Sequence, residues 1–190
     1  MNKGILFIIS GTSGSGKTTI GKEIIKELGE KIRHIATYTT RKIRQNEIDG
    51  EDYNFLSEDE FKVFNANDFF IETVEINGFM YGTPQKINNL LEKGKNVLMI
   101  INRCGVERFK KLHINTFSIW IDCDDKTISE RIKKRCKATE TFIQNRVKIN
   151  ETERAAEKNS PICNIHLSNI DVENTVSAVL DFFESKINNR

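Results

Sequence analysis

The sequence predicts an α/β fold built on a central parallel sheet. Four short apolar or β-branched runs are expected to be strands buried on both faces, at residues 5–10, 97–101, 117–121 and 162–167. Helical patterns lie between or after these runs, at residues 17–28, 84–91, 126–135, 140–157 and 171–187. This alternation is typical of βαβ units, whose crossovers are right-handed.

The length and the charge balance narrow the class of protein. A chain of 190 residues with 38% hydrophobic residues can bury one large core with inserted substructures. The 29 Lys and Arg against 27 Asp and Glu leave a net charge of +2. Because this charge creates no strong overall field, we expect no binding to nucleic acid and only a local preference for anions.

The four cysteines are widely spaced, at Cys104, Cys123, Cys136 and Cys163. They form no CxxC pair, so we expect neither zinc nor disulfides, and a reducing cytoplasm fits best. The apolar segment 4–10 is too short to span a membrane and is interpreted as a buried strand.

A glycine-rich motif follows the first predicted strand and precedes the first predicted helix. It reads Gly11-Thr12-Ser13-Gly14-Ser15-Gly16-Lys17-Thr18, which matches the G-x-x-x-x-G-K-[ST] pattern. Backbone N–H groups of such a loop surround a phosphate, Lys17 reaches the β and γ oxygens, and Thr18 ligates Mg²⁺. A turn that binds nothing is the alternative. The loop predicts ATP binding but does not choose between hydrolysis, switching and phosphoryl transfer.

The region 34–83 interrupts the α/β alternation. It contains a polar loop, an alternating strand at 69–76 and an Asn77-Gly78 turn, and therefore predicts a small β-rich insertion. Ser57 and Glu60 have the spacing of a capping box at a helix start. Thr83 followed by Pro84 predicts a second helix start.

Polar side chains in this insertion suit a phosphorylated acceptor. Arg41 and Arg44 lie three residues apart, and Tyr53 and Tyr81 bring phenolic hydroxyls from its two ends. Guanidinium groups bind phosphate oxygens in a bidentate manner, so these side chains are candidates for an anion cage. A solvated basic loop is the alternative.

Glu72 lies on the alternating strand and shares a face with Val74. Guanine presents two adjacent donors, N1–H and N2–H2, which one carboxylate can accept together, whereas adenine offers no such pair. Glu72 therefore favours guanine as the base of the acceptor, with a solvent-facing glutamate as the alternative.

The chain resembles the guanylate kinase family in four motifs, residues 10–19, Thr39-Thr40-Arg41, Gly50-Glu51-Asp52-Tyr53-Asn54-Phe55 and Tyr81-Gly82-Thr83. The resemblance covers nearly the whole chain. It implies a P-loop NTPase three-layer core (1–33, 86–124 and 158–190), a β-rich GMP-binding insertion (34–85) and a helical lid (125–157). It further implies a kinase, monomeric or homodimeric, that uses ATP and Mg²⁺ to convert GMP or dGMP into the diphosphate.

The resemblance also implies residue roles. Residues 11–19, ending with Thr19, would bind ATP. Arg41, Arg44, Tyr53 and Tyr81 would hold the GMP phosphate, and Thr37, Glu72 and Thr83 would read the guanine edge. Lys17, Arg41 and the lid arginines Arg131, Arg135 and Arg146 would be catalytic, because they stabilise charge on the transferred group. Helix-surface cations paired with Glu130, Glu151 or Glu153 are the alternative for the lid arginines.

The chain departs from the family after the predicted strand 97–101. Where the family usually carries two aspartates, this chain has Ile100 and Asn102, and only Asn102 can still accept a bond from a guanine amine. Arg103, at the carboxyl end of a core strand, could recognise another phosphate. This keeps open a ribosyl bisphosphate phosphokinase of the same superfamily. A non-catalytic guanylate kinase-like binding module is the third reading.

Overall fold

The computed structural model describes residues 2–45, 47–76, 78–112, 115–135 and 139–189. A five-stranded sheet has the order β2-β7-β1-β8-β9, and all its neighbouring strands are parallel. The strands are β2 (Ile32–His34), β7 (Asn96–Ile100), β1 (Leu6–Gly11), β8 (Thr116–Asp122) and β9 (Ile165–Ser168). The predicted parallel α/β sheet is therefore confirmed, with β2 as an additional strand.

Burial along the strands follows their place in the sheet. The central strand β1 is buried along its whole length, as its unbroken apolar run predicts. The prediction of a last strand at 162–167, buried on both faces, is wrong in two respects. Strand β9 begins at Ile165, and its residues alternate between half-buried and exposed. Because β9 is an edge strand, it has a neighbour on one side only.

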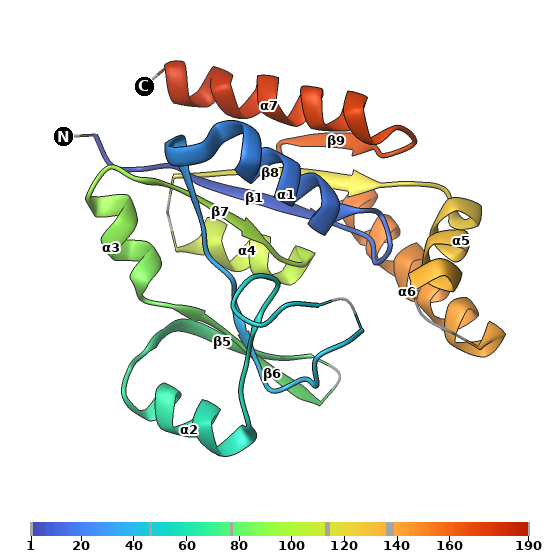
Figure 1. The fold of residues 1–190 in the computed structure, drawn as a ribbon, viewed down its shortest axis with the longest axis horizontal. Coiled ribbons are helices and arrows are strands. Elements are labelled where there is room, and N and C mark those ends of the chain that lie inside the picture. Colours follow the sequence, from blue (N-terminus) through green and yellow to red (C-terminus); the bar gives the residue numbers. More distant parts are fainter. Residues whose placement is uncertain (1, 46, 77, 113–114, 136–138, 190) are drawn as a thin grey trace.

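Helices cover both faces of the sheet and give three layers (Figure 1). On one face, α1 (Lys17–Leu28) and α7 (Val172–Asn188) pack over a core that includes Phe7, Ile24 and Phe183. On the other face, α3 (Lys86–Glu92) and α4 (Arg103–Lys111) pack over a core that includes Leu91 and Phe109. Successive residues of β1 point to opposite faces and so contribute to both cores.

Two helix predictions need correction. The predicted start at Thr83-Pro84 is wrong, because both residues lie in strand β6 (Phe79–Pro84), paired with β5 (Phe70–Ile76). Hairpin pairing outweighs the local capping signal there, and α3 begins at Lys86. Helix α4 has no counterpart among the predicted helices, although Asn102 caps its first turn.

A second sheet, of order β4-β3-β6-β5, is formed by residues between 38 and 84. Its remaining strands are β3 (Tyr38–Thr39) and β4 (Asn54–Phe55), and α2 (Glu58–Ala66) packs against it. The predicted capping box is confirmed, since Ser57 accepts from the Glu60 amide while Glu60 accepts from the Ser57 amide. Of the predicted Asn77-Gly78 turn, Asn77 lies outside the described residues.

Two further helices, α5 (Asp125–Arg135) and α6 (Glu140–Asn159), pack against each other beside the carboxyl ends of β1 and β8 (Figure 1). Among the helices of the described residues, none is long and apolar enough to cross a membrane. The described cysteines Cys104, Cys123 and Cys163 are free thiols, and Cys136 lies outside the described residues.

Candidate active site

The glycine-rich loop connects β1 to α1, as the motif predicts. Gly16 stands at the helix N-cap with φ of +96°, a conformation that favours glycine, and a Cβ there would overlap the amide of Asn169. The Lys17 Nζ donates to the carbonyl oxygens of Gly11 at 2.9 Å and Thr12 at 2.6 Å. Its ammonium therefore lies curled over the loop, where a phosphate can take over these bonds.

Distant side chains hold the loop in shape. The fully buried Asn150 of α6 exchanges two bonds of 2.9 Å with the backbone N–H and C=O of Ser13. The carbonyl of Ser15 accepts from Asn169 Nδ2 at 2.6 Å and from Arg131 Nη1 at 3.2 Å. Tertiary contacts thus fix the loop backbone in advance of any ligand.

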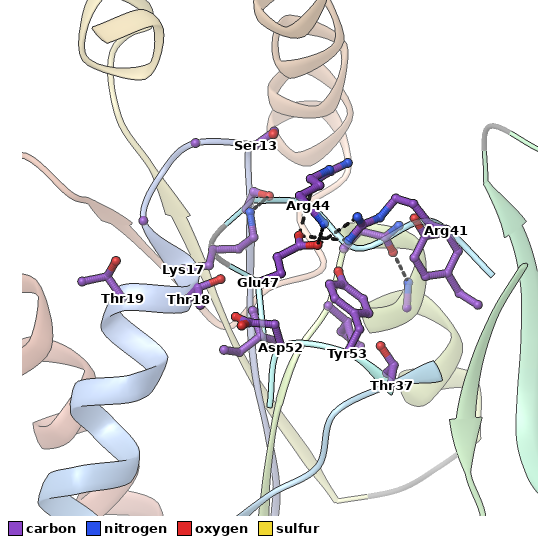
Figure 2. A pocket seen from close by; sticks show the side chains of 18 of the residues that line it. Ser13, Lys17, Thr18, Thr19, Thr37, Arg41, Arg44, Glu47, Asp52 and Tyr53 are labelled. Atoms are coloured by element: carbon purple, nitrogen blue, oxygen red, sulfur yellow. Dashed lines mark hydrogen bonds and ion pairs between the residues drawn. The ribbon is translucent and has the colours of Figure 1, made fainter. Parts of the chain in front are cut away.

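A cavity of about 1070 Å³ joins this loop to the second sheet. Of the site residues named from the sequence, those that line it are Gly11, Ser13, Gly14, Gly16, Lys17, Thr18, Thr19, Thr37, Arg41, Arg44, Tyr53, Glu72, Tyr81, Thr83, Asn102, Arg131 and Arg146. Figure 2 shows Lys17, Thr18 and Thr19 on one side and Arg41, Tyr53 and Thr37 on the other. Thr12 and Ser15 are fully buried and do not line it. The side chain of Arg135 lies outside the described part of the chain.

Arg41 is held by a carboxylate that the sequence reading did not identify. Glu47 accepts from Arg41 Nη1 at 2.9 Å and Nη2 at 3.0 Å, and from the Arg44 backbone N–H at 2.9 Å. The side chains of Arg41 and Glu47 are 8% and 5% exposed. Burial opposes ionisation of Glu47, but the bonds from Arg41 and the Arg44 amide keep its pKa below the usual value. The Arg41–Glu47 pair is therefore ionised at neutral pH.

The two tyrosines lie beside this pair. Their ring centroids are 6.1 Å apart, and the Arg41 guanidinium lies 5.2 Å from the centre of the Tyr53 ring. Burial, with a smaller contribution from Tyr81, raises the pKa of Tyr53, so its hydroxyl stays a donor at neutral pH. Gly82, next to Tyr81, allows the backbone to pack closely against the Phe70 ring, since a Cβ there would lie 2.7 Å from that ring. The structure thus brings the predicted phosphate-binding side chains together on one wall.

Glu72 faces the cavity, as the strand alternation predicts, together with Val74. Its Oε1 accepts from Thr83 Oγ1 and its Oε2 from Arg108 Nη1, both at 2.8 Å. Thr37 is buried and lines the same cavity. The three side chains expected to read a guanine edge therefore share one site.

Ile100 and Asn102, which stand where the family usually carries two aspartates, make other contacts here. The Asn102 Oδ1 accepts from the Gly105 N–H at 3.0 Å and caps α4, while Asn102 still lines the cavity. Ile100 lies against α1, where a Cβ on Gly21 would overlap its side chain. An apolar contact between β7 and α1 thus replaces a carboxylate at this edge.

Arg103 does not line the cavity. Its Nε donates to the buried Glu157 at 2.9 Å, and its Nη2 donates to the Ser160 carbonyl at 2.6 Å. Glu157 also accepts from the amides of Ile162 and Cys163. The expectation of an extra phosphate-binding cation is therefore wrong, because Arg103 anchors the end of α6 instead.

The described arginines of the predicted lid have different partners. Arg131 donates to the backbone of Ser15 and to the Asn169 carbonyl, so it is bound to the loop rather than to a helix-surface glutamate. Arg146 lies over the Phe142 ring at 5.2 Å and lines the cavity. Burial raises the pKa of the nearby Glu153, an effect that Lys17 and Arg146 oppose.

Sequence reasoning missed three residues that shape the site: Glu47, Arg108 and Asn150. For Arg108 a signal existed, since an asparagine N-cap at Asn102 followed by a basic last turn is typical of a helix. Asn150 carries no such local signal, because only the fold brings its partner Ser13 to it. Glu47 lies close to Arg41 and Arg44 along the chain, but in an irregular segment without a periodic pattern that would predict the pairing.

A phosphate loop and a second wall with two arginines and two tyrosines in one cavity fit a P-loop NTPase fold and an ATP-dependent phosphotransferase of the nucleoside monophosphate kinase class. The family model described as "Guanylate kinase" matches residues 3–186. The chain therefore belongs to the guanylate kinase family.

Curated relatives agree with this assignment. The chain is 36% identical to a guanylate kinase of Onion yellows phytoplasma over 148 residues, covering 76% of this chain and 70% of that protein. It is also 36% identical to one of Clostridium perfringens over 149 residues, covering 77% and 68%. A crystal structure of guanylate kinase from Anaplasma phagocytophilum matches with a TM-score of 0.75 at 23% identity, covering 98% of this chain and 87% of that one. This last likeness confirms the fold.

Proposed function

We propose that the protein transfers the γ-phosphate of ATP to GMP or dGMP and releases ADP and the guanosine diphosphate. One observation carries the proposal: the loop that ends in Lys17 and Thr18 and the wall that carries Arg44 and Glu72 line the same cavity. Its volume of about 1070 Å³ lies at the upper end of the roughly 300–1,000 Å³ that is usual for ligand pockets, and its lining extends from the phosphate loop to the second sheet. The cavity therefore offers one place for a donor at the loop and another for an acceptor at the opposite wall.

The donor groups of the loop fit ATP and its metal. The glycines hold the backbone in the positive-φ conformations of an anion-binding turn, and Lys17 supplies an ammonium that can exchange its bonds to the loop carbonyls for phosphate oxygens. Thr18 supplies one hydroxyl ligand, which suits Mg²⁺ because this ion usually keeps several waters and binds substrate phosphates. Bound Mg²⁺ would neutralise charge on the phosphate oxygens.

The acceptor needs no general base, because its phosphate oxygen is already ionised. Arg44 is half-exposed in the cavity, and Arg41 is pre-positioned by Glu47. With Tyr53 and Tyr81 they would align one phosphate oxygen for in-line attack on the γ-phosphorus. The P–O bond to ADP then breaks as the new bond forms. Positioning of this kind can supply up to roughly 7–11 kcal/mol of barrier reduction.

The lid would complete the site. Arg131 and Arg146 already approach the loop and the cavity, and they would exchange their present partners for phosphate oxygens on closure. Arg135, whose side chain lies outside the described part of the chain, is proposed for the same task. We extend the proposal to the division into a core (1–33, 86–124, 158–190), a GMP-binding insertion (34–85) and a lid (125–157), and to a reducing cytoplasm, which suits the free described cysteines.

The alternatives lose support. A ribosyl bisphosphate acceptor had Arg103 as its main argument, and this side chain is bound to Glu157. Such an acceptor would also leave Glu72 and Thr83 without a base to read. A non-catalytic binding module would not need the phosphate loop that Asn150 and Asn169 hold in shape.

A coupled assay of ADP release tests the proposal, with GMP, dGMP, AMP, UMP and ribosyl bisphosphate as acceptors. We expect turnover with GMP and dGMP to exceed turnover with AMP or UMP by at least 10²-fold, because a polar site left unpaired rejects the wrong base strongly. Turnover with ribosyl bisphosphate alone would replace the proposal by its rival. ATP binding without turnover on any acceptor would support the binding module.

A further inference from the structure

An arginine of the core reaches the base-reading carboxylate of the second sheet. Arg108 lies in the last turn of α4, and its Nη1 donates to Glu72 Oε2 at 2.8 Å. The same nitrogen donates to the Thr73 carbonyl at 2.6 Å. Glu72 lines the cavity and Arg108 does not, so the guanidinium contacts the carboxylate from outside the cavity.

Both oxygens of Glu72 are thereby fixed by protein donors. Thr83 holds Oε1 and Arg108 holds Oε2. Each carboxylate oxygen has two lone-pair sites, so each keeps one for a ligand. Two held oxygens define the plane of the carboxylate, and a defined plane is what bidentate acceptance from two adjacent donors requires.

We infer that Arg108 is a positioning residue for acceptor recognition, which acts through Glu72 and sets the preference for a base with two adjacent donors. The inference rests on the proposed function, because it presumes that Glu72 reads a guanine edge. Arg108 itself lies outside the cavity, on helix α4, which packs on the five-stranded sheet.

The contribution to recognition can be separated from stability. The side chains of Glu72 and Arg108 are 15% and 38% exposed, so the pair is partly in contact with water and its loss costs less than the loss of one partner of a fully buried ion pair. Removal of the guanidinium should therefore leave a folded protein in which Thr83 alone holds Glu72. A carboxylate held at one oxygen no longer has a fixed plane for bidentate acceptance, while ATP binding at the distant loop is unaffected.

The experiment compares Arg108→Ala, Arg108→Lys and the control Lys111→Ala. Lys111 lies in the same turn of α4, carries the same charge and pairs with Glu107 at the surface. Measured quantities are kcat, KM for ATP, and KM for GMP and for inosine monophosphate, which lacks the 2-amino group. For Arg108→Ala we expect KM for GMP to rise about tenfold, the loss expected for one charge-assisted hydrogen bond.

The rise for inosine monophosphate should be smaller, since only one of its donors meets the carboxylate. KM for ATP should stay at the wild-type value, and the protein should remain folded at the assay temperature with a modestly lower melting temperature. Arg108→Lys should recover part of the loss, and Lys111→Ala should match the wild type in every quantity. An unchanged KM for GMP in Arg108→Ala would overturn the inference, as would equal rises in KM for GMP and ATP.

A double-mutant cycle with Glu72→Gln tests whether Arg108 acts through Glu72. We expect Arg108→Ala to have little further effect on GMP affinity in the Glu72→Gln background, with calorimetric Kd used where turnover is weak. A full tenfold effect in that background would overturn the inference. Absence of GMP turnover in the wild type refutes the proposed function itself. Normal GMP turnover in the wild type, together with an unchanged KM for GMP in Arg108→Ala, refutes only the positioning role.

Discussion

Replacement of Glu47 by glutamine probes the buried ion pair that holds Arg41. Glutamine keeps the volume and one carbonyl oxygen, but it puts an amide NH₂ where Oε2 accepts from Arg41 Nη1 and the Arg44 amide. The guanidinium of Arg41, 8% exposed, is then left without its counter-charge. We expect a less stable protein and a higher KM for GMP.

The magnitude follows from the burial of the pair. Removal of one partner of a buried ion pair costs about 3–5 kcal/mol, because the other charge stays desolvated. We take the lower end, about 3 kcal/mol, since Arg41 lines the cavity and can turn toward water there. For a chain of this size, 1 kcal/mol corresponds to roughly 2–4 °C in Tm, so the expected decrease is about 6–12 °C.

Calorimetry at pH 7 measures this decrease, with Glu184→Gln as the matched control. Glu184 pairs with Lys31 at 3.5 Å at the surface, with side-chain exposures of 46% and 65%. Its removal should change Tm by no more than about 4 °C, because exposed pairs contribute at most about 1 kcal/mol. A Glu47→Gln variant that melts within that margin of the wild type would refute the reasoning.

Three further predictions concern the loop, the base and the acid limit of stability. Lys17→Met should reduce kcat by at least 10³-fold in the ADP-release assay, since no other side chain of the loop carries a charge to the γ-phosphate; wild-type turnover would remove the loop from catalysis. Glu72→Gln should raise KM for GMP at least tenfold and leave KM for ATP unchanged; equal rises would exclude Glu72 from base reading. Burial opposes ionisation of Glu157, but bonds from the Cys163 amide, His166 and other donors keep its pKa below the ordinary 4.5. Its contribution is therefore complete above pH 4.5 and is lost as the pH falls toward the lowered native pKa. Melting curves from pH 7 to pH 3 should show a smaller acid loss in Glu157→Gln than in the wild type, and parallel curves would contradict this.

Local signals were sufficient for most of the fold. The unbroken apolar run of β1 and the strong helical pattern of α1 needed no tertiary information, and neither did the capping box at Ser57 and Glu60. The start of α3 was misplaced, because a hydroxyl N-cap and a proline are a weaker influence than the strand pairing that holds Thr83 opposite Glu72. Helix α4 was missed because it is short and highly charged, although its apolar residues Val106 and Phe109 recur at helical spacing and share one buried face.

The site divides in the same way. The residue types of the phosphate loop and the alternation that turns Glu72 and Val74 to one face are written in the chain, because both depend on neighbours a few residues away. The sequence alone therefore determined the α/β class and the phosphate loop, and it predicted a phosphorylated acceptor with a guanine base. Only the tertiary structure decided that Glu47 neutralises Arg41, that Arg108 holds Glu72 and that Arg103 anchors α6. The physical reason is that a charged side chain pairs with whatever opposite charge the packed elements bring within a few ångströms, and that distance is set by the fold rather than by spacing along the chain.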